Sequence, residues 1–238
     1  TGTAGGMGGA CINDLTGLED FISLDSLFFE TNYNCSVLDL SMNTGITYLS
    51  CGGLSTLDVS GCNSLTSLDC SLNVLSSLDV GQNTALTYLD CRQNTFLKSL
   101  DLSQNTALEY LNCSMNELDT IDLSQNTSLT TLVSHECEFM SLDVGQNTAL
   151  TTLVCFSNDL TTLDLGNNTA LTYLDCGGNQ LTCLNLKNGN NSNLEDLETY
   201  DNPNLTCIEV EDADYSNTNW LNNDDFQLDN NHYFSNDC

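Results

Sequence analysis

The feature that most constrains this chain is a phrase that recurs at a nearly constant spacing. Residues 86–186 divide into lines such as LTYLDCRQNTFLKSLDLSQNTA, LEYLNCSMNELDTIDLSQNTS and LTTLVCFSNDLTTLDLGNNTA, each 21 or 22 residues long. Each line contains the phrase L-x-x-L-x-(C or L)-x-x-N twice, so the unit consists of two half-turns. A fixed period of this length indicates a stack of coils, each of which contacts only its neighbours.

The alternation of residues within one line predicts the shape of a coil. Leu89 and Cys91 alternate with Tyr88 and Asp90, which is the period of a strand with one buried face. Residues 97–102 repeat the pattern, and polar residues between the two segments form corners. One coil cannot cover its own apolar side chains, so equivalent strands must pair in parallel. This is the leucine-rich-repeat signature. We predict a mostly β solenoid of about nine 21-residue coils, with parallel sheets on two sides and little or no helix.

The repeat also predicts the domain organisation. Residues 1–12 are small and Gly-rich and are expected to form an N-terminal arm. The solenoid is predicted for residues 13–206, with regular coils over residues 46–186. Beyond residue 206 the repeat stops and aromatic residues become frequent, so residues 207–238 are predicted to fold over the last coil as a C-terminal cap.

Stacking turns the columns of the repeat into ladders. Asparagines fill two corner columns, where an inward amide supplies donors and an acceptor to buried backbone groups. A third column is predicted to contain buried free thiols, because side chains that point the same way cannot readily adopt disulfide torsions. Nothing groups four ligands tetrahedrally, so no zinc site is predicted. The structural cysteines of this column are Cys51, Cys70, Cys91, Cys113, Cys155 and Cys176.

The lines with a recurring Cys resemble the cysteine-ladder leucine-rich repeats of bacterial internalin-type surface proteins, and the flanking residues 14–21 and 202–238 are similar to secreted repeat proteins of Bacteroidetes bacteria. The resemblance implies a secreted or cell-surface module that is not an enzyme and is often adhesive. It also implies that a disulfide between Cys207 and Cys238 closes the cap, although Cys183 lies in the same column and is a competing partner. Cys11 and Cys35 are candidates to staple the first coil. Such bonds imply an oxidising, extracellular setting.

An acidic column runs along the second strand position. Neighbouring carboxylates about 5 Å apart repel by roughly 0.8 kcal/mol per pair even in bulk water. The interpretation we favour is that hydroxyl hydrogen bonds, salt screening and raised pKa values in some members offset this repulsion. The alternative is calcium held between adjacent coils, although no D-x-D-x-D-G loop is present. The candidate ligands are Asp58, Asp79, Asp101, Asp122, Asp143 and Asp164.

The first strand position carries the candidate binding face. Tyrosines recur in one outward column and carboxylates in the next, a combination used in protein and sugar recognition. The same residues are also ordinary on an exposed strand. The candidate binding residues are Tyr48, Tyr88, Tyr110, Tyr173, Asp69, Asp90 and Asp175.

Charge and composition exclude several classes of function. The chain has 33 acidic residues against three Lys and Arg, a formal charge of −30, which disfavours nucleic acid and anionic membranes as partners. Its apolar runs are far too short to span a bilayer, so no membrane insertion is predicted, and the absence of a signal peptide from this sequence carries little weight. No catalytic constellation or phosphate-binding loop is present, so neither an enzyme nor a required cofactor is predicted.

Two functional classes remain. The chain is either an extracellular module that binds a protein or glycan ligand, or a structural subunit that joins other copies of itself head to tail in a filament. The Gly-rich arm and an unpaired cysteine, left over from an odd total of 13, would serve the second role. Ser26 and Thr120 are candidate glycosylation sites, because Asp25-Ser-Leu and Asp119-Thr-Ile resemble the O-glycosylation motif of Bacteroidetes secreted proteins.

Overall fold

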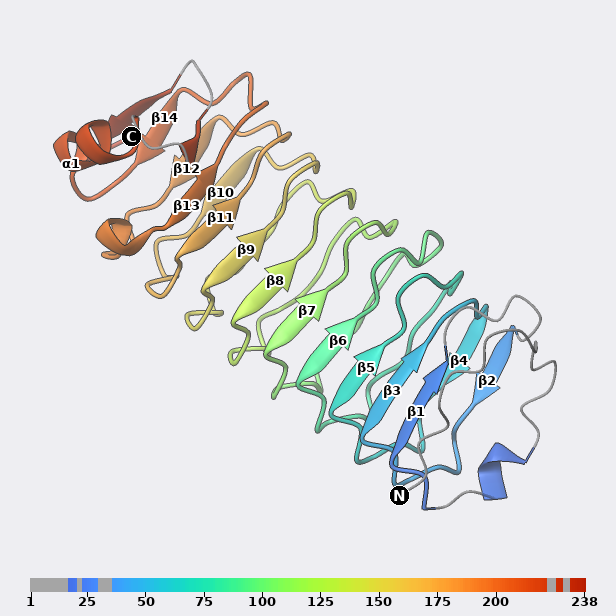
Figure 1. Ribbon diagram of the computed structural model, residues 1–238. Coiled ribbons are helices and arrows are strands. Elements are labelled where there is room, and N and C mark those ends of the chain that lie inside the picture. The colour runs from blue at the N-terminus through green and yellow to red at the C-terminus, as the bar shows by residue number, and fades with distance from the viewer. Residues whose placement is uncertain (1–16, 21–22, 30–35, 222–225, 229–231) are drawn as a thin grey trace.

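The computed structural model describes residues 17–20, 23–29, 36–221, 226–228 and 232–238, in which the coils stack along one axis (Figure 1). The long sheet contains ten parallel strands, nine from the predicted coils and one from the C-terminal tail. The predicted solenoid is therefore confirmed. In order across the sheet, the strands are β1 (Ser26–Phe29), β3 (Tyr48–Cys51), β5 (Ser67–Asp69), β6 (Tyr88–Asp90), β7 (Tyr110–Asn112), β8 (Thr131–Val133), β9 (Thr152–Val154), β11 (Tyr173–Asp175), β13 (Asp196–Glu198) and β15 (Phe226–Gln227).

A central leucine fixes the register of nearly every strand in this sheet. Leu89 pairs with Leu68 on one side and Leu111 on the other, and all three are fully buried. Burial of such a side chain contributes about 1.5–3 kcal/mol. A slip of one residue would turn this column outward, so the repeated leucine specifies one register along the whole stack.

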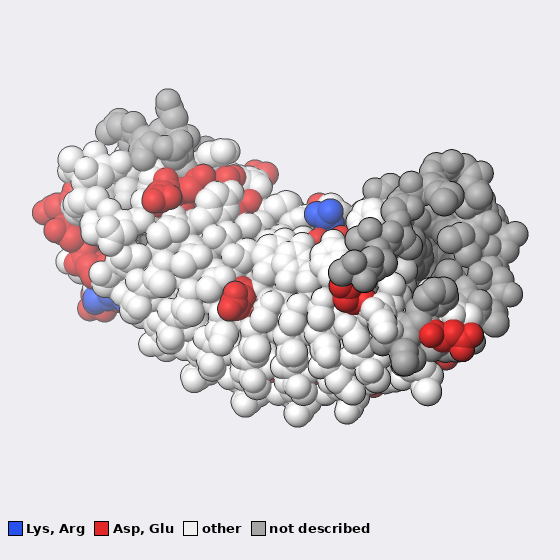
Figure 2. Space-filling model, turned by 60° about the horizontal axis from the view of Figure 1, so that its bottom comes forward, with Lys and Arg blue, Asp and Glu red and all other residues white. Residues whose placement is uncertain are grey.

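The opposite side of the solenoid is hydrogen-bonded into sheets only near its ends. β2 (Val37–Asp39) pairs with β4 (Thr56–Asp58), and a four-stranded sheet contains β10 (Thr162–Asp164), β12 (Cys183–Asn185), β14 (Cys207–Glu209) and β16 (Tyr233–Ser235). The equivalent segments of the coils between β4 and β10 are not strands. The second predicted sheet is therefore interrupted in the middle. The molecule is bowed, with the ten-stranded sheet facing its hollow upper side in Figure 2.

The first asparagine ladder satisfies the corner that follows each strand. The amide of Asn94 donates to the carbonyls of Cys91, at 2.9 Å, and of Cys70 in the preceding coil, at 3.0 Å. Its Oδ1 accepts from the backbone N–H of Leu75 at 3.1 Å. Cys137 replaces asparagine at one rung, and its thiol donates to the carbonyl of Cys113 at 3.3 Å. This column therefore joins each coil to the preceding one.

The second asparagine ladder uses its amide nitrogens in the same way. Asn105 Nδ2, for example, donates to the carbonyls of Val80 and Asn83 at 3.0 and 2.9 Å. The Oδ1 atoms of this ladder differ, because several of them are buried without a hydrogen-bond partner among the described residues. These are the Oδ1 atoms of Asn83, Asn105, Asn126, Asn147 and Asn168.

The cysteine ladder lies in the core. All six of its thiols are buried, and none of them is part of a disulfide. Burial raises the pKa of these thiols, to about 12 at Cys51 and well above the usual value at Cys70 and Cys176, so they stay protonated. Ser134 stands in this column where the ladder is broken, and it is equally buried.

The C-terminal residues continue both sides of the stack. β15 adds to the ten-stranded sheet and β16 to the four-stranded one, and a disulfide joins Cys207 to Cys238. The short helix α1 (Ala213–Asn219) lies between β14 and β15 in the chain. Two 3-10 helices occur, at Leu18–Asp20 and at Asn191–Asn193. The ring of Trp220 is stacked on Phe226 with centroids 5.4 Å apart.

Several predicted features lie outside the described residues. These include the arm of residues 1–12 and the candidate disulfide partners Cys11 and Cys35, so the first-coil staple stays a prediction.

Candidate functional site

The outer face of the ten-stranded sheet carries the predicted tyrosine column. The rings of Tyr88 and Tyr110 are stacked, with centroids 4.5 Å apart and planes 6° from parallel. Tyr48 belongs to the same column but is separated from this pair by Ser67, and Tyr173 lies beyond two threonines. The structure thus brings two of the four predicted tyrosines together.

The carboxylates of the neighbouring column are less exposed than strand alternation predicts. Asp90 and Asp175 point away from the core, yet only 4% and 6% of their surfaces are exposed, whereas Asp69 is half-buried. In all three, Oδ1 accepts the backbone N–H two residues later, at 3.0 to 3.1 Å. Sequence alternation gives the direction of a side chain, but neighbouring side chains decide whether water reaches it.

Burial perturbs the acids of this face. It raises the pKa of Asp175 to about 6, and the charges of Glu198 and Asp196 add to the effect. Burial also raises the pKa of Asp90, although Arg92 opposes the shift with its Nε 3.7 Å from Asp90 Oδ2. The phenols stay protonated, since burial raises the pKa of Tyr88 and of Tyr173 to about 12.

A third column on this face was missed by the sequence analysis. It consists of the residue after each ladder cysteine. Here the rings of His135 and Phe156 are stacked with centroids 4.3 Å apart. Burial lowers the pKa of His135, so the imidazole is largely neutral near pH 7. The signal was present, because the repeat alignment has a column directly after the cysteine. The members of the column are Gly52, Ser71, Arg92, Ser114, His135, Phe156, Gly177 and Tyr200, of which His135 and Tyr200 follow Ser134 and Thr199 at the cysteine position.

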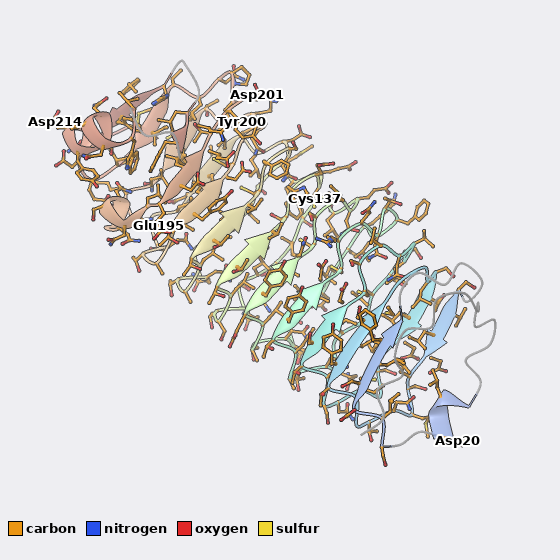
Figure 3. All side chains as sticks on the ribbon, in the orientation of Figure 1. Asp20, Cys137, Glu195, Tyr200, Asp201 and Asp214 are labelled. Carbon is orange, nitrogen blue, oxygen red and sulfur yellow. A yellow bond between two sulfur atoms is a disulfide. The ribbon has the colours of Figure 1, made fainter. Side chains whose placement is uncertain are left out.

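The face changes character along the stack. In its middle, Val133 and Val154 pair in register at the position that acids occupy in β6 and β11, and His135 and Phe156 follow them two residues later in the chain. In Figure 2 acidic residues gather at the end that carries the C-terminus, while the middle of the molecule is mostly uncharged. Tyr200 and Asp201 lie on the upper rim at that end, and Glu195 on the opposite rim (Figure 3).

The acidic column on the other side of the solenoid has a structural role at the corners. Each carboxylate accepts the backbone N–H two residues later, as Asp101 does from Ser103 at 2.9 Å. Raised pKa values were predicted for some members of this column, but the pKa values of Asp39, Asp101 and Asp122 are lowered instead. Hydrogen bonds from the serines two residues later lower these pKa values, and exposure to water screens the neighbouring charges. The hydroxyls that interact with these three acids belong to the corner serines Ser41, Ser103 and Ser124.

The calcium hypothesis gains no support from the geometry. Across the described part of the chain, no three or more His, Cys, Asp or Glu side chains are arranged to hold a metal ion. Asn185 Nδ2 donates to Asp164 Oδ1 at 2.8 Å, so one pair of adjacent rungs is already joined by a hydrogen bond.

The remaining candidates are placed as follows. Thr120 is exposed with its hydroxyl 3.4 Å from Asp119 Oδ1, and Ser26 is half-buried at the start of β1. Cys183 is a half-buried free thiol whose Cα pairs in register with that of Cys207. Within the described ranges, no helix combines the length and apolar character needed to cross a bilayer.

Neither a family model nor a curated protein matches the sequence. Solved structures do match it. The functional domain of InlJ from Listeria monocytogenes, described as including a cysteine ladder, is 29% identical over 94% of this chain and 60% of that one, with a TM-score of 0.64. This chain therefore spans about 60% of that structure's length.

Two further structures share the fold at lower identity. The internalin InlF from Listeria monocytogenes is 20% identical over 93% of this chain and 72% of its own, with a TM-score of 0.61. The ectodomain of the Arabidopsis thaliana receptor kinase GASSHO1/SCHENGEN3, in complex with CASPARIAN STRIP INTEGRITY FACTOR 2, is 22% identical over 81% of this chain and 31% of its own, with a TM-score of 0.62. The chain thus has the leucine-rich-repeat fold, and its structural neighbours include internalin-type proteins with a cysteine ladder.

Proposed function

We propose that this chain is a non-enzymatic module that binds a protein ligand on the outer face of its ten-stranded sheet. The observation that carries the proposal is the pair of stacked tyrosine rings, Tyr88 and Tyr110, on that face and outside the core. Aromatic residues that present a flat apolar ring and a polar tip are enriched where proteins bind one another. The half-buried His135 and Phe156 extend this aromatic surface toward the middle of the sheet.

The surrounding scaffold suits this role. The strands are held in register by buried leucines and by asparagine ladders, so the face is preorganised and loses little freedom on binding. The receptor ectodomain among the structural neighbours was solved with a factor bound, and the other neighbours include internalins. We infer from these likenesses a site of action outside the cell or at its surface, and a role in adhesion or ligand recognition.

The test is a selection of protein binders from a displayed library against the folded chain, followed by competition with variants. Tyr88→Ala combined with Tyr110→Ala should abolish binding of most selected ligands without unfolding the chain. The matched control is Ser99→Ala combined with Thr162→Ala, which alters exposed residues on the opposite side. If only the control pair of substitutions weakens ligand binding, the binding surface lies elsewhere on the molecule. A glycan array read in parallel would reveal a carbohydrate ligand instead.

A further inference from the structure

The C-terminal end of the binding face carries a cluster in which acids and phenols converge. The cluster, here called the acidic end, consists of Tyr173, Asp175, Asp196, Glu198 and Tyr200, from strands β11 and β13 and the residues that follow them. Asp175 and Glu198 are register partners, as are Tyr173 and Asp196. Tyr173 Oη donates to Glu198 Oε1 at 3.3 Å, so the phenol and the acid already lie together.

Asp175 is the buried member of this cluster and is incompletely satisfied. Its exposed fraction is 6%, and its only hydrogen bond among the described residues runs from Gly177 N–H to Oδ1 at 3.1 Å. The second carboxylate oxygen accepts no hydrogen bond from those residues. Burial is the main cause of the raised pKa of Tyr173 and of Tyr200, and the charge of Asp175 adds to both shifts, which places all three groups in one electrostatic neighbourhood. A buried carboxylate without a counter-charge is costly, so a bound cation would be strongly favoured.

The chain itself has no cation to offer at this place. Its three Lys and Arg side chains lie in the described region, and each forms an ion pair elsewhere. Arg92 pairs with Asp90 at 3.7 Å, Lys98 with Glu117 at 3.2 Å and Lys187 with Glu209 at 3.4 Å. No Lys or Arg of this chain therefore neutralises Asp175 and Glu198, and a binding partner can supply the counter-charge.

The repeat shows where such a cation sits when the chain does supply it. In the coil that contains Asp90, the residue after the ladder cysteine is Arg92, and its guanidinium lies beside the acid. In the coil that contains Asp175, the same position is Gly177, and the ring of Tyr200 covers it. A Cβ on Gly177 would be 2.5 Å from Tyr200 Cζ. The acidic end therefore has an aromatic wall where the other coil has a cation.

We infer that the acidic end receives an arginine side chain of the protein partner. A guanidinium can donate several hydrogen bonds to Asp175 and Glu198 and can stack on an aromatic ring, which an ammonium ion does less well. The inference rests on the proposed function, because it assumes that the partner is a protein on this face. It adds the chemistry of the contact and its position at one end of the sheet.

The test uses the intact chain and N-acetyl-argininamide, followed by amide chemical shifts in NMR spectra at about 0.15 M salt, where long-range attraction is screened. Saturable shifts are expected at Gly177, Glu198 and Tyr200. Asp175→Asn and Glu198→Gln should each weaken binding about tenfold, since each removes a charged hydrogen-bond partner. Asp90→Asn is the matched control, because that acid already has Arg92, and it should leave the affinity unchanged.

Three results would overturn the inference. One is the absence of saturable shifts at those amides. Another is a uniform response along exposed acids such as Asp101 and Asp122, which would indicate nonspecific attraction to a highly acidic protein. The third is tighter binding of N-acetyl-lysinamide or calcium than of the arginine probe at the same amides. If Asp175→Asn fails to fold, Glu198→Gln alone decides the result. If the arginine probe does not bind but selected protein ligands still depend on Tyr88 and Tyr110, the arginine contact alone is rejected. If the probe binds but no selected ligand depends on Tyr88 and Tyr110, the proposed function is rejected.

Discussion

The hexapeptide Leu-Thr-Tyr-Leu-Asp-Cys occurs twice in this chain, at residues 86–91 and 171–176, and its two copies have different surroundings. In the first copy, Tyr88 stacks on Tyr110 and Asp90 lies beside Arg92. The equivalent residues of the second copy meet Asp196, Glu198 and the Tyr200 ring. One copy is a neutralised, stacked surface, and the other is a concentration of negative charge.

The comparison separates what a coil specifies by itself from what its neighbours specify. Both hexapeptides form a strand with a buried leucine and an outward acid, because alternation and the ladder cysteine are the same. The chemistry of the outward acid depends on the residue after the cysteine and on the next coil. In a repeat protein, function can therefore vary from coil to coil while the scaffold stays constant.

The largest difference between the copies is expected from a single methyl group after the cysteine. Gly177→Ala should lower the free energy of unfolding by about 1–3 kcal/mol, because its Cβ would collide with the Tyr200 ring. Arg92→Ala should cost about 1 kcal/mol or less, since the Arg92 side chain is half exposed even though its partner Asp90 is buried. Urea unfolding measures both. Adding Tyr200→Ser to Gly177→Ala should recover most of the loss, and a failure to do so would show that the ring is not the obstacle.

Neutralising the two acids should have unequal effects on stability. Asp175→Asn should raise the free energy of unfolding near pH 7 by on the order of 1 kcal/mol, because it removes a buried charge with no counter-charge. Asp90→Asn should give a smaller gain, because it also removes the partner of Arg92. The pKa of Asp175 is raised to about 6 from an ordinary 3.8, so the folded state binds the proton more tightly and stability falls as pH rises through about 6. The gain should therefore vanish below about pH 4, which unfolding curves at several pH values will check.

The smallest expected effect concerns the tyrosines. A double-mutant cycle on Tyr88 and Tyr110 should give a coupling of about 0.5–1 kcal/mol from ring stacking. The same cycle on Tyr173 and Glu198 should give about 0.5 kcal/mol, since their hydrogen bond is only partly buried. If the coupling between Tyr173 and Glu198 were as large as that between Tyr88 and Tyr110, the two copies would be more alike than their contacts indicate.

Much of the fold could be predicted from the sequence because a repeat presents the same evidence many times. The leucine and cysteine columns predicted the register, and the strand positions followed from it. The interrupted second sheet could not be predicted, because the segments between β4 and β10 that are not strands have the same sequence pattern as those two strands. Helix α1 was also missed, although Asp212 is a suitable N-cap and accepts from the backbone N–H groups of Asp214 and Tyr215.

The candidate site was predicted less completely. The outward tyrosines and acids follow from alternation, which gives direction. Burial of Asp90 and Asp175 does not follow from alternation, and the roles of Arg92 and Gly177 belong to the column after the ladder cysteines. On the opposite side, the lowered pKa values of Asp101 and Asp122 depend on the corner N–H and hydroxyl groups that bind these acids, and neighbour repulsion alone does not predict them.

The measurement that tests this account most directly is a pH titration of the side-chain carboxyl carbons of Asp90 and Asp175 by NMR in one sample. The account predicts that Asp175 titrates near pH 6 and that Asp90, beside Arg92, titrates at a lower pH. It also predicts that Arg92→Ala moves Asp90 toward Asp175. Equal titration midpoints in the unmodified chain, or a higher midpoint for Asp90, would contradict the claim that the two copies differ in their counter-charge.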